Sequence, residues 1–236
     1  MERASYQAAG ENERMTEDLW TTVDRYAARL LVRPDEALDA AERESVSAGL
    51  PPIGVTPAIG RFLQLLARVR GARSILEIGT LAGYSTIWLA RALPPGGRLI
   101  TLEAEAIHAE VARRNIAHAG LADVVEIRVG RALDTLPDLL ARKAGPFDFV
   151  FIDADKPATP DYFRWALRLS APGSVIVVDN AVRGGGIADA ANTDPGVRAM
   201  RRLHKMLSEE PHVSATLIQT VGSKGYDGFV MAVVEE

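Results

Sequence analysis

The stretch Ser74-Ile-Leu-Glu-Ile-Gly-Thr-Leu-Ala-Gly-Tyr-Ser85 reads as an apolar strand, a glycine-bearing turn and the start of a helix. This order is typical of the first unit of an α/β domain that binds a nucleotide or nucleoside where the strand ends. A dinucleotide fingerprint needs a further glycine, which lets the backbone approach a pyrophosphate, but Leu81 stands between Gly79 and Gly83. The stretch therefore favours a ligand without a pyrophosphate.

Two acidic residues accompany this turn. Glu77 lies inside the otherwise apolar strand, where a carboxylate is costly unless it has a partner. Glu103 ends the next predicted strand, 24 residues after Gly79, where an acid takes the ribose hydroxyls of a nucleoside. An ordinary strand, turn and helix with two acids at the rim is the alternative. The combined pattern favours nucleoside binding.

Downstream of this stretch, short apolar runs alternate with helical segments. The predicted strands are Ser74–Ile78, Gly97–Leu102, Val124–Val129, Phe147–Ile152 and Ser174–Val178, and the predicted helices are Ser85–Ala92, Ala106–Ala119, Ala132–Ala141, Asp161–Leu169 and a last one from Asp194-Pro195 to about Leu207. Strands that are apolar on both faces indicate a parallel sheet covered by helices. The final runs, Ala215–Val221 and Phe229–Val234, lie only seven residues apart. That is too short for a crossover helix, so we expect an antiparallel hairpin.

Upstream of the stretch the pattern is helical. Residues 1–15 are polar and lack periodicity, which predicts a mobile arm. Helices are expected over Thr16–Leu31, from Pro34-Asp35 to Ser47, and from Thr56-Pro57 to Gly71, the last with the buried stripe Phe62, Leu65, Leu66 and Val69. No linker separates two cores, so residues 16–236 are expected to form one domain, with N-terminal helices over 16–71 and the sheet core over 72–236.

The composition excludes several classes of function. The chain has 236 residues, 27 of them Lys or Arg and 31 Asp or Glu, and a net charge of −4 argues against nucleic-acid binding. The absence of cysteine excludes disulfides, thiolate zinc sites and a cysteine nucleophile. Neither a membrane-spanning run nor the apolar segment of a secretory signal is present in the sequence. We therefore expect a cytoplasmic protein without a membrane partner.

Polar residues end two neighbouring strands. Asp153, Asp155 and Lys156 follow one strand, and Asp179 and Asn180 follow the next. Parallel neighbours end at the same edge of a sheet, so Asp153, Asp179 and Asn180 are expected to converge. Carboxylate and amide oxygens suit Mg²⁺, Mn²⁺ or Ca²⁺ rather than Zn²⁺. Helix capping and loop turns are the alternative for such residues, but two adjacent acidic strand ends favour a site.

Other candidate motifs are weaker. The four histidines form no ligand pair and are expected at the surface, and the sequence contains neither a P-loop nor a serine-hydrolase elbow. The run Gly184-Gly185-Gly186 is expected to form a flexible loop beside the site. Arg113-Arg114 and Arg201-Arg202 lie on predicted helices and are expected to face solvent.

The segments LEIGTLAGYST, FVFIDADK and VVDN occur here in an order and spacing that resemble the cation-dependent class I O-methyltransferases, the caffeoyl-CoA and catechol O-methyltransferase group. The resemblance runs from about Gly54 to the C-terminus. It implies a Rossmann-like, seven-stranded, mostly parallel sheet of order 3-2-1-4-5-7-6, with helices on both faces and an N-terminal helical extension.

The same resemblance implies roles for individual residues. S-adenosylmethionine would be contacted by Val55, Glu77, Gly79, Thr80, Ser85, Glu103, Ala132 and Asp155. The metal would be held by Asp153, Asp179 and Asn180, and Lys156 falls where catechol-type members have a catalytic lysine. One departure concerns the acceptor: the family often has an aromatic residue and an Asn after the second metal motif, whereas this chain has Arg183-Gly184.

These observations predict an enzyme that methylates a small, catechol-like phenolic acceptor with S-adenosylmethionine and a divalent cation, Mg²⁺ before Mn²⁺ or Ca²⁺. Chelation by adjacent oxygens would explain a preference for a vicinal diol. A homodimer is expected, because the helix Thr16–Leu31 and the stripe on the third helix lie outside the sheet core and must cover apolar surface. The rival interpretations are an NAD-type dehydrogenase and a nucleoside-binding module without catalysis.

Overall fold

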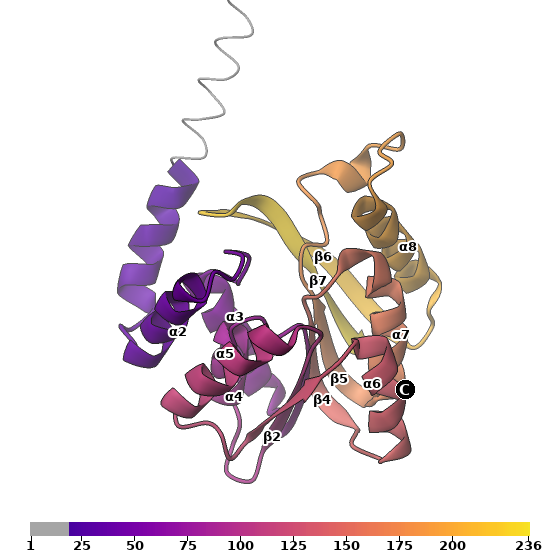
Figure 1. The fold of residues 1–236 in the computed structure, drawn as a ribbon. Coiled ribbons are helices and arrows are strands. Elements are labelled where there is room, and N and C mark those ends of the chain that lie inside the picture. The colour runs from indigo at the N-terminus through magenta and orange to yellow at the C-terminus, as the bar shows by residue number, and fades with distance from the viewer. Residues whose placement is uncertain (1–18) are drawn as a thin grey trace, which may run out of the picture.

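The computed structural model describes residues 19–236 (Figure 1). The sheet has seven strands in the order β3-β2-β1-β4-β5-β7-β6, and β7 runs antiparallel to both β5 and β6. The predicted strand order and hairpin are therefore confirmed. The expected arm over residues 1–15 and the helix start at Thr16 lie outside the described residues.

The strands are β1 (Ser74–Ile78), β2 (Arg98–Glu103), β3 (Val125–Val129), β4 (Phe147–Ile152), β5 (Ser170–Val178), β6 (Val213–Gly222) and β7 (Gly225–Val234). A first helix covers residues 19–31. It is followed by α2 (Glu36–Ser47), α3 (Pro57–Arg70), α4 (Tyr84–Ala90), α5 (Ala106–His118), α6 (Ala132–Ala141), α7 (Thr159–Arg168) and α8 (Pro195–Glu209). Among these described helices, none has the length and apolar content of a membrane span.

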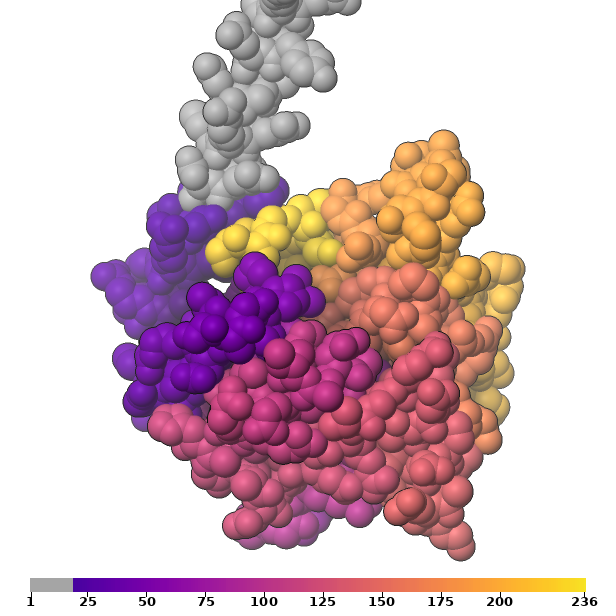
Figure 2. All heavy atoms as spheres, in the orientation of Figure 1, coloured from indigo at the N-terminus to yellow at the C-terminus, as the bar shows by residue number. Residues whose placement is uncertain are grey.

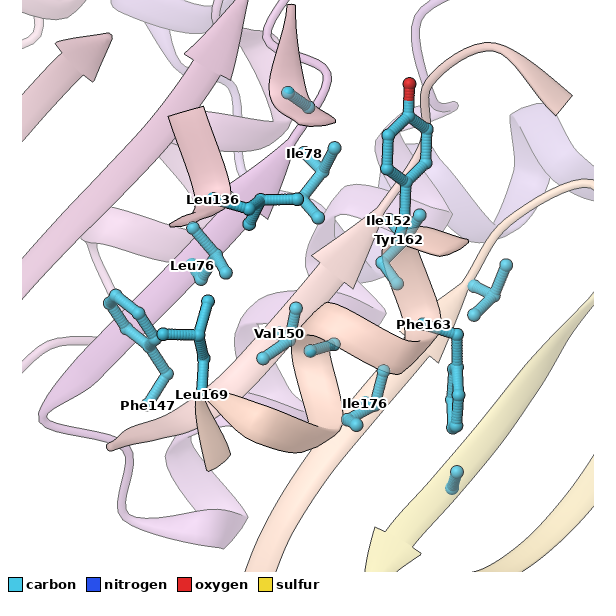
Figure 3. Close-up of a cluster of buried hydrophobic side chains, with 14 of the residues drawn as sticks. Leu76, Ile78, Leu136, Phe147, Val150, Ile152, Tyr162, Phe163, Leu169 and Ile176 are labelled. Carbon is cyan, nitrogen blue, oxygen red and sulfur yellow. The ribbon is translucent and has the colours of Figure 1, made fainter. Parts of the chain in front are cut away.

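The helices cover the sheet in two layers, as the period of two along each strand requires. On one face, Leu76 and Ile78 of β1 pack with α6, α7 and α8 around Phe163 (Figure 3). On the other face, Ile75 of β1 and Phe149 of β4 pack against α3 and α4. Because both faces are buried, the inner parallel strands β1, β2 and β4 are mostly apolar, and this is why their positions are readable from the sequence.

Helix α3 differs from expectation in the face that it buries. Its N-cap at Thr56 and C-cap at Gly71 lie as predicted, and Phe62 and Leu66 pack at the core. Leu65 and Val69, however, are 44% and 85% exposed, so the predicted stripe is wrong in half of its members. The buried face carries the small or polar residues Gly60, Gln64 and Ala67 beside Leu63. Gly60 lies so close to the indole of Trp88 on α4 that a Cβ there would overlap it.

The first helix and α2 lie beside the C-terminal hairpin, on the same face of the molecule (Figure 2). The carboxylate of Asp24 accepts a hydrogen bond of 2.8 Å from the backbone N–H of Ser223 in the β6–β7 turn. Lys224, from the same turn, donates to the carbonyl oxygen of Gly54 in the loop between α2 and α3. Segments from the two ends of the sequence thus meet above the carboxyl ends of the parallel strands.

Arg201 on α8 does not face solvent as predicted. Its guanidinium donates to the carbonyl oxygens of Ile187 at 3.0 Å, Gly186 at 3.2 Å and Asn192 at 3.4 Å. These carbonyls belong to a short 3₁₀ turn (Gly186–Ala188) and the loop after it, where the regular pairing of a helix or a sheet ends, so a side-chain donor adds to their hydrogen bonds. Arg201 therefore fastens the end of the Gly184–Gly186 run to α8.

Candidate functional site

A cavity of about 930 Å³ opens at the carboxyl ends of the parallel strands. Its wall includes the turns after β1, β2, β3 and β4, the residues after β5, helix α2, the loop of residues 50–55 and Lys224. The structure brings together there the predicted residues Val55, Gly79, Thr80, Ser85, Glu103, Ala132, Asp153, Asp155, Lys156 and Asn180. Glu77 and Asp179 are not part of the lining.

The turn after β1 has no room for a side chain at Gly79. Its φ is +100°, and a Cβ there would overlap the backbone carbonyl of Asp153 at the end of β4. The backbone N–H of Asp153 donates to the Ile78 carbonyl at 2.8 Å, so the two strand ends are joined directly. The first turn and the acidic strand end therefore share one floor of the cavity because residue 79 is glycine.

Glu103 at the end of β2 fixes the turn after β1 through hydrogen bonds to its backbone. Its Oε2 accepts from the backbone N–H groups of Thr80 at 3.1 Å and Leu81 at 2.8 Å, and its Oε1 accepts from Glu105 at 3.0 Å. His108 Nδ1 lies 3.4 Å from Oε1. His108 was expected at the surface, and this prediction is wrong because α5 begins at Ala106 and brings the half-buried imidazole into the cavity wall.

Glu77 lies beneath the turn rather than in the cavity. It points to the α4 face of the sheet and is completely buried. Its carboxylate accepts hydrogen bonds from the hydroxyls of Thr86 at 2.5 Å, Ser85 at 2.7 Å and Thr101 at 2.7 Å. Burial raises the pKa of Glu77 to about 7, although these hydroxyl donors oppose the shift. Glu77 is thus a buried support of the turn outside the cavity lining, and its contact with the cofactor stays a prediction.

The acidic ends of β4 and β5 form the second part of the site. Lys156 Nζ lies 2.6 Å from Asp153 Oδ1. Burial, and next the charge of Asp153, raise the pKa of Asp179 to about 7, so these two carboxylates lie close enough to repel each other. Asn180 has a left-handed φ of 55°, which only a few per cent of non-glycine residues adopt, and its backbone N–H donates to Asp179 Oδ1 at 2.7 Å.

Within residues 19–236 there is no group of three or more His, Cys, Asp or Glu side chains with metal-ligand proximity. The predicted set of Asp153, Asp179 and Asn180 contains two carboxylates and one amide. It therefore depends on the amide oxygen of Asn180 for its third protein ligand.

Three cavity residues were missed in the sequence. Tyr162 on α7 donates its phenol proton to Asp155, and burial raises the pKa of Tyr162 above its usual range. Arg183 follows Asn180, and Lys224 arrives from the hairpin turn. Tyr162 and Lys224 carry no local motif, and only the tertiary structure brings them to the strand ends. For Arg183 a signal was available, because it lies three residues after a predicted ligand.

Comparison with known proteins gives the reaction class. A family model described as O-methyltransferase matches residues 30–232 of the 236. The chain belongs to this family. The expected seven-stranded fold and the expected membership of the S-adenosylmethionine-dependent O-methyltransferases are thereby confirmed.

Similar O-methyltransferases are known from several bacteria. A catechol O-methyltransferase of Niastella koreensis is 52% identical over 221 residues, which are 94% of this chain and all of that protein. The catechol O-methyltransferase of Mycobacterium tuberculosis is 54% identical over 90% of this chain and 94% of its own length.

Solved structures agree with this fold. The O-methyltransferase of Bacillus cereus, solved in complex with SAH, superposes with a TM-score of 0.91 at 54% identity, covering 92% of this chain and 99% of that one. The O-methyltransferase TomG of Streptomyces achromogenes, involved in tomaymycin synthesis and solved with SAM, gives 0.90 at 54% identity over 93% of this chain and 99% of its own.

Proposed function

We propose that this O-methyltransferase transfers the methyl group of S-adenosylmethionine to one hydroxyl of a small vicinal-diol phenol and requires a divalent cation. The observation that carries the proposal is the common floor of the cavity, where the turn after β1 and Glu103 adjoin Asp153, Lys156 and Asn180. A methyl donor bound over the first group and a diol bound over the second would meet above Gly79.

The cofactor end of the cavity fits a nucleoside. Glu103 presents a carboxylate at the end of β2, where ribose hydroxyls are bound in such sheets. Gly79 packs directly against the Asp153 carbonyl and lines the cavity, and Val55, Ala132 and Asp155 complete a partly apolar wall. The cofactor supplies an electrophilic methyl group on a sulfonium, and the protein contributes chiefly by fixing its direction.

The metal end fits a hard cation. Burial, and next the charge of Asp153, raise the pKa of Asp179, so a cation between these carboxylates would be favourable, and oxygen ligands of this kind suit Mg²⁺. Such a cation lowers the pKa of a hydroxyl that it binds. Adjacent hydroxyls on one ring could both bind the cation at the positions that Asp153, Asp179 and Asn180 leave open. This would explain the expected preference for a diol.

Lys156 is placed to accept the acceptor's proton. Its amine lies at the cavity wall within 2.6 Å of Asp153 Oδ1, and its side chain is only 15% exposed. The transfer forms one O–C bond and breaks one S–C bond, and the hydroxyl proton leaves to a base. A divalent cation bound at Asp153 would disfavour the protonated form of the neighbouring Lys156 amine, and the neutral amine could then take that proton and pass it to solvent.

The test is a comparison of three isomers, 1,2-, 1,3- and 1,4-dihydroxybenzene, with S-adenosylmethionine as donor. We expect methylation of the 1,2-isomer, its loss with EDTA, and its recovery with Mg²⁺. Full activity after exhaustive chelation, or equal use of the 1,3-isomer, would contradict the proposal. Asp179→Ala should lose activity because it removes a proposed metal ligand. It should still fold, because the residue lies at a strand end rather than in the core.

We further infer a homodimer of single-domain chains, with residues 16–236 forming the domain. The support is the exposure of apolar side chains on the first helix, where Leu19, Val23, Tyr26 and Leu30 are each more than half exposed. Apolar surface of this kind is rarely left uncovered on a monomer. A cytoplasmic location, suggested by the lack of cysteine, stays a prediction.

A further inference from the structure

The acceptor end of the cavity carries three cationic side chains, and two of them have their own partners. Lys156 forms the ion pair with Asp153. Lys224 donates to the Gly54 carbonyl, and its charge interacts with that of Glu42 on α2. The third is Arg183, which lines the same cavity.

Arg183 differs from these two lysines because its positive charge is not balanced by a carboxylate partner. In the described part of the chain its side chain has neither an ion pair nor a hydrogen bond, and its Nε is buried without a partner. A buried polar group without a partner is costly. In the absence of an internal partner, a ligand of the cavity is the natural source of one.

The position of Arg183 is fixed by its backbone. It has a left-handed φ of 56°. The Oδ1 of Asp227 accepts from the backbone N–H groups of Val182, Arg183 and Gly228, each at 2.9 Å. A non-glycine residue held in this conformation marks a constrained and often functional position. The side chain is therefore delivered to the cavity by a loop that is pinned to β7.

Arg183 and Lys156 flank the same point of α8. A Cβ placed on Gly196 would lie 3.1 Å from Asp194 Oδ1, 3.2 Å from Lys156 Cβ and 3.6 Å from Arg183 Nε, although Asp194 forms no ion pair with Arg183 within 4 Å. The stem of Lys156 and the guanidinium of Arg183 thus border the same glycine. Asp153 and Arg183 line the same cavity, so a ring bound at Asp153 would lie in the cavity that the guanidinium borders.

Building on the proposed function, we propose that Arg183 binds a carboxylate carried by the acceptor, so that the enzyme selects vicinal diols whose ring bears an acid group. The guanidinium is planar and offers parallel N–H donors that match a carboxylate in two hydrogen bonds. Neutral substituents at the same place would leave the buried Nε–H without an anionic partner.

The experiment compares kcat/KM for 3,4-dihydroxybenzoate and 3,4-dihydroxybenzamide, which have the same diol and nearly the same size. The acid-to-amide ratio of the wild-type enzyme is divided by the ratio of Arg183→Gln, so that differences in intrinsic reactivity of the two phenols cancel. Loss of a charge-assisted hydrogen bond corresponds to about tenfold or more. We expect the quotient to be at least about ten.

Two further variants make the result decisive. Arg183→Gly suits the left-handed backbone and should lose the preference as Arg183→Gln does, even if the glutamine variant folds poorly. Arg198→Gln removes an exposed cation from α8 outside the cavity and should keep the wild-type ratio. A quotient near one for both Arg183 variants would overturn the inference. If the wild type methylates neither these two diols nor 1,2-dihydroxybenzene, the proposed function itself fails; if it methylates them but the quotient is near one, only the role of Arg183 is refuted.

Discussion

The amine of Lys156 lies 2.6 Å from Oδ1 of Asp153, three residues earlier in the chain. The short loop of residues 153–155 after β4 and the 3₁₀ turn of Lys156–Ala158 bring these side chains to the same side of the cavity. A proposed cation ligand and a proposed base are therefore in contact before any ligand binds. Removing the lysine would leave Asp153 in place but take away the proton acceptor.

We expect Lys156→Met to lower kcat by about 10²–10⁴-fold, the usual contribution of a positioned base, with little change in the affinity for S-adenosylmethionine. Steady-state kinetics and calorimetry measure the two quantities. Lys205→Met, which removes an exposed lysine on α8, is the control and should keep the wild-type kcat. A kcat within a few-fold of wild type would show that Lys156 is not the base.

Glu103→Ala should weaken S-adenosylmethionine binding by about tenfold or more, because charge-assisted hydrogen bonds contribute about 1.5–3 kcal/mol each. The same carboxylate accepts from Thr80 and Leu81, so the variant should also loosen the turn after β1. Calorimetric titration gives the dissociation constant. Glu105→Ala, an exposed neighbour, should bind as the wild type does. An unchanged affinity in Glu103→Ala would refute the ribose role.

The strands and their acidic ends were predictable because each depends on a local pattern. A parallel strand buried on both faces is continuously apolar, so Phe147–Ile152 was located at both ends before Asp153 could be assigned. The cofactor turn was readable for the same reason, since the requirement for glycine at residue 79 arises where two such strands end.

The buried face of α3 and the contribution of the β6–β7 turn to the cavity wall were not predictable in this way. Hydrophobicity selected Leu65 and Val69, but close helix contact needs small residues, and Gly60 against Trp88 decides the buried face. Lys224 lies at the cavity only because the β6–β7 hairpin reaches the loop at Gly54, a contact between residues 170 positions apart. Periodicity within one segment contains no information about such a contact.

Glu77 predicts a pH dependence of stability. Its pKa is raised by burial from the ordinary 4.5 to about 7. Below about pH 4.5 the group is neutral in both states; as the pH rises to about 7 the unfolded chain loses the proton first, so the free energy of unfolding falls by up to about 3 kcal/mol. Above pH 7 this contribution no longer changes.

The variant Glu77→Gln is neutral throughout and should lack this decline. Urea unfolding at pH 5 and pH 8 measures it: the stability of wild type relative to Glu77→Gln should be lower at pH 8 than at pH 5. Glu44→Gln, at an exposed position on α2, is the control and should follow the wild type at both pH values. A constant difference between wild type and Glu77→Gln would mean that Glu77 titrates normally in the folded protein.

The first helix supplies the last prediction. Leu19, Val23, Tyr26 and Leu30 recur at intervals of four, three and four residues, so they form one apolar stripe, and all are more than half exposed. The opposite side of the helix is the one that meets the hairpin, through Asp24. Since a two-fold symmetric pair is the commonest closed assembly, we expect this stripe to be covered by the same stripe of a second copy.

Light scattering at micromolar concentration should therefore give about twice the 25.4 kDa of one chain. Tyr26→Glu places a charge in the middle of the stripe and should shift the mass toward the monomer, because a charge without a partner is costly in an apolar interface. Arg25→Glu introduces the same side chain at the neighbouring exposed position, away from the stripe, and should leave the dimer intact. A wild-type mass near 25.4 kDa would end the dimer proposal, and a dimer that survives Tyr26→Glu would place the interface elsewhere.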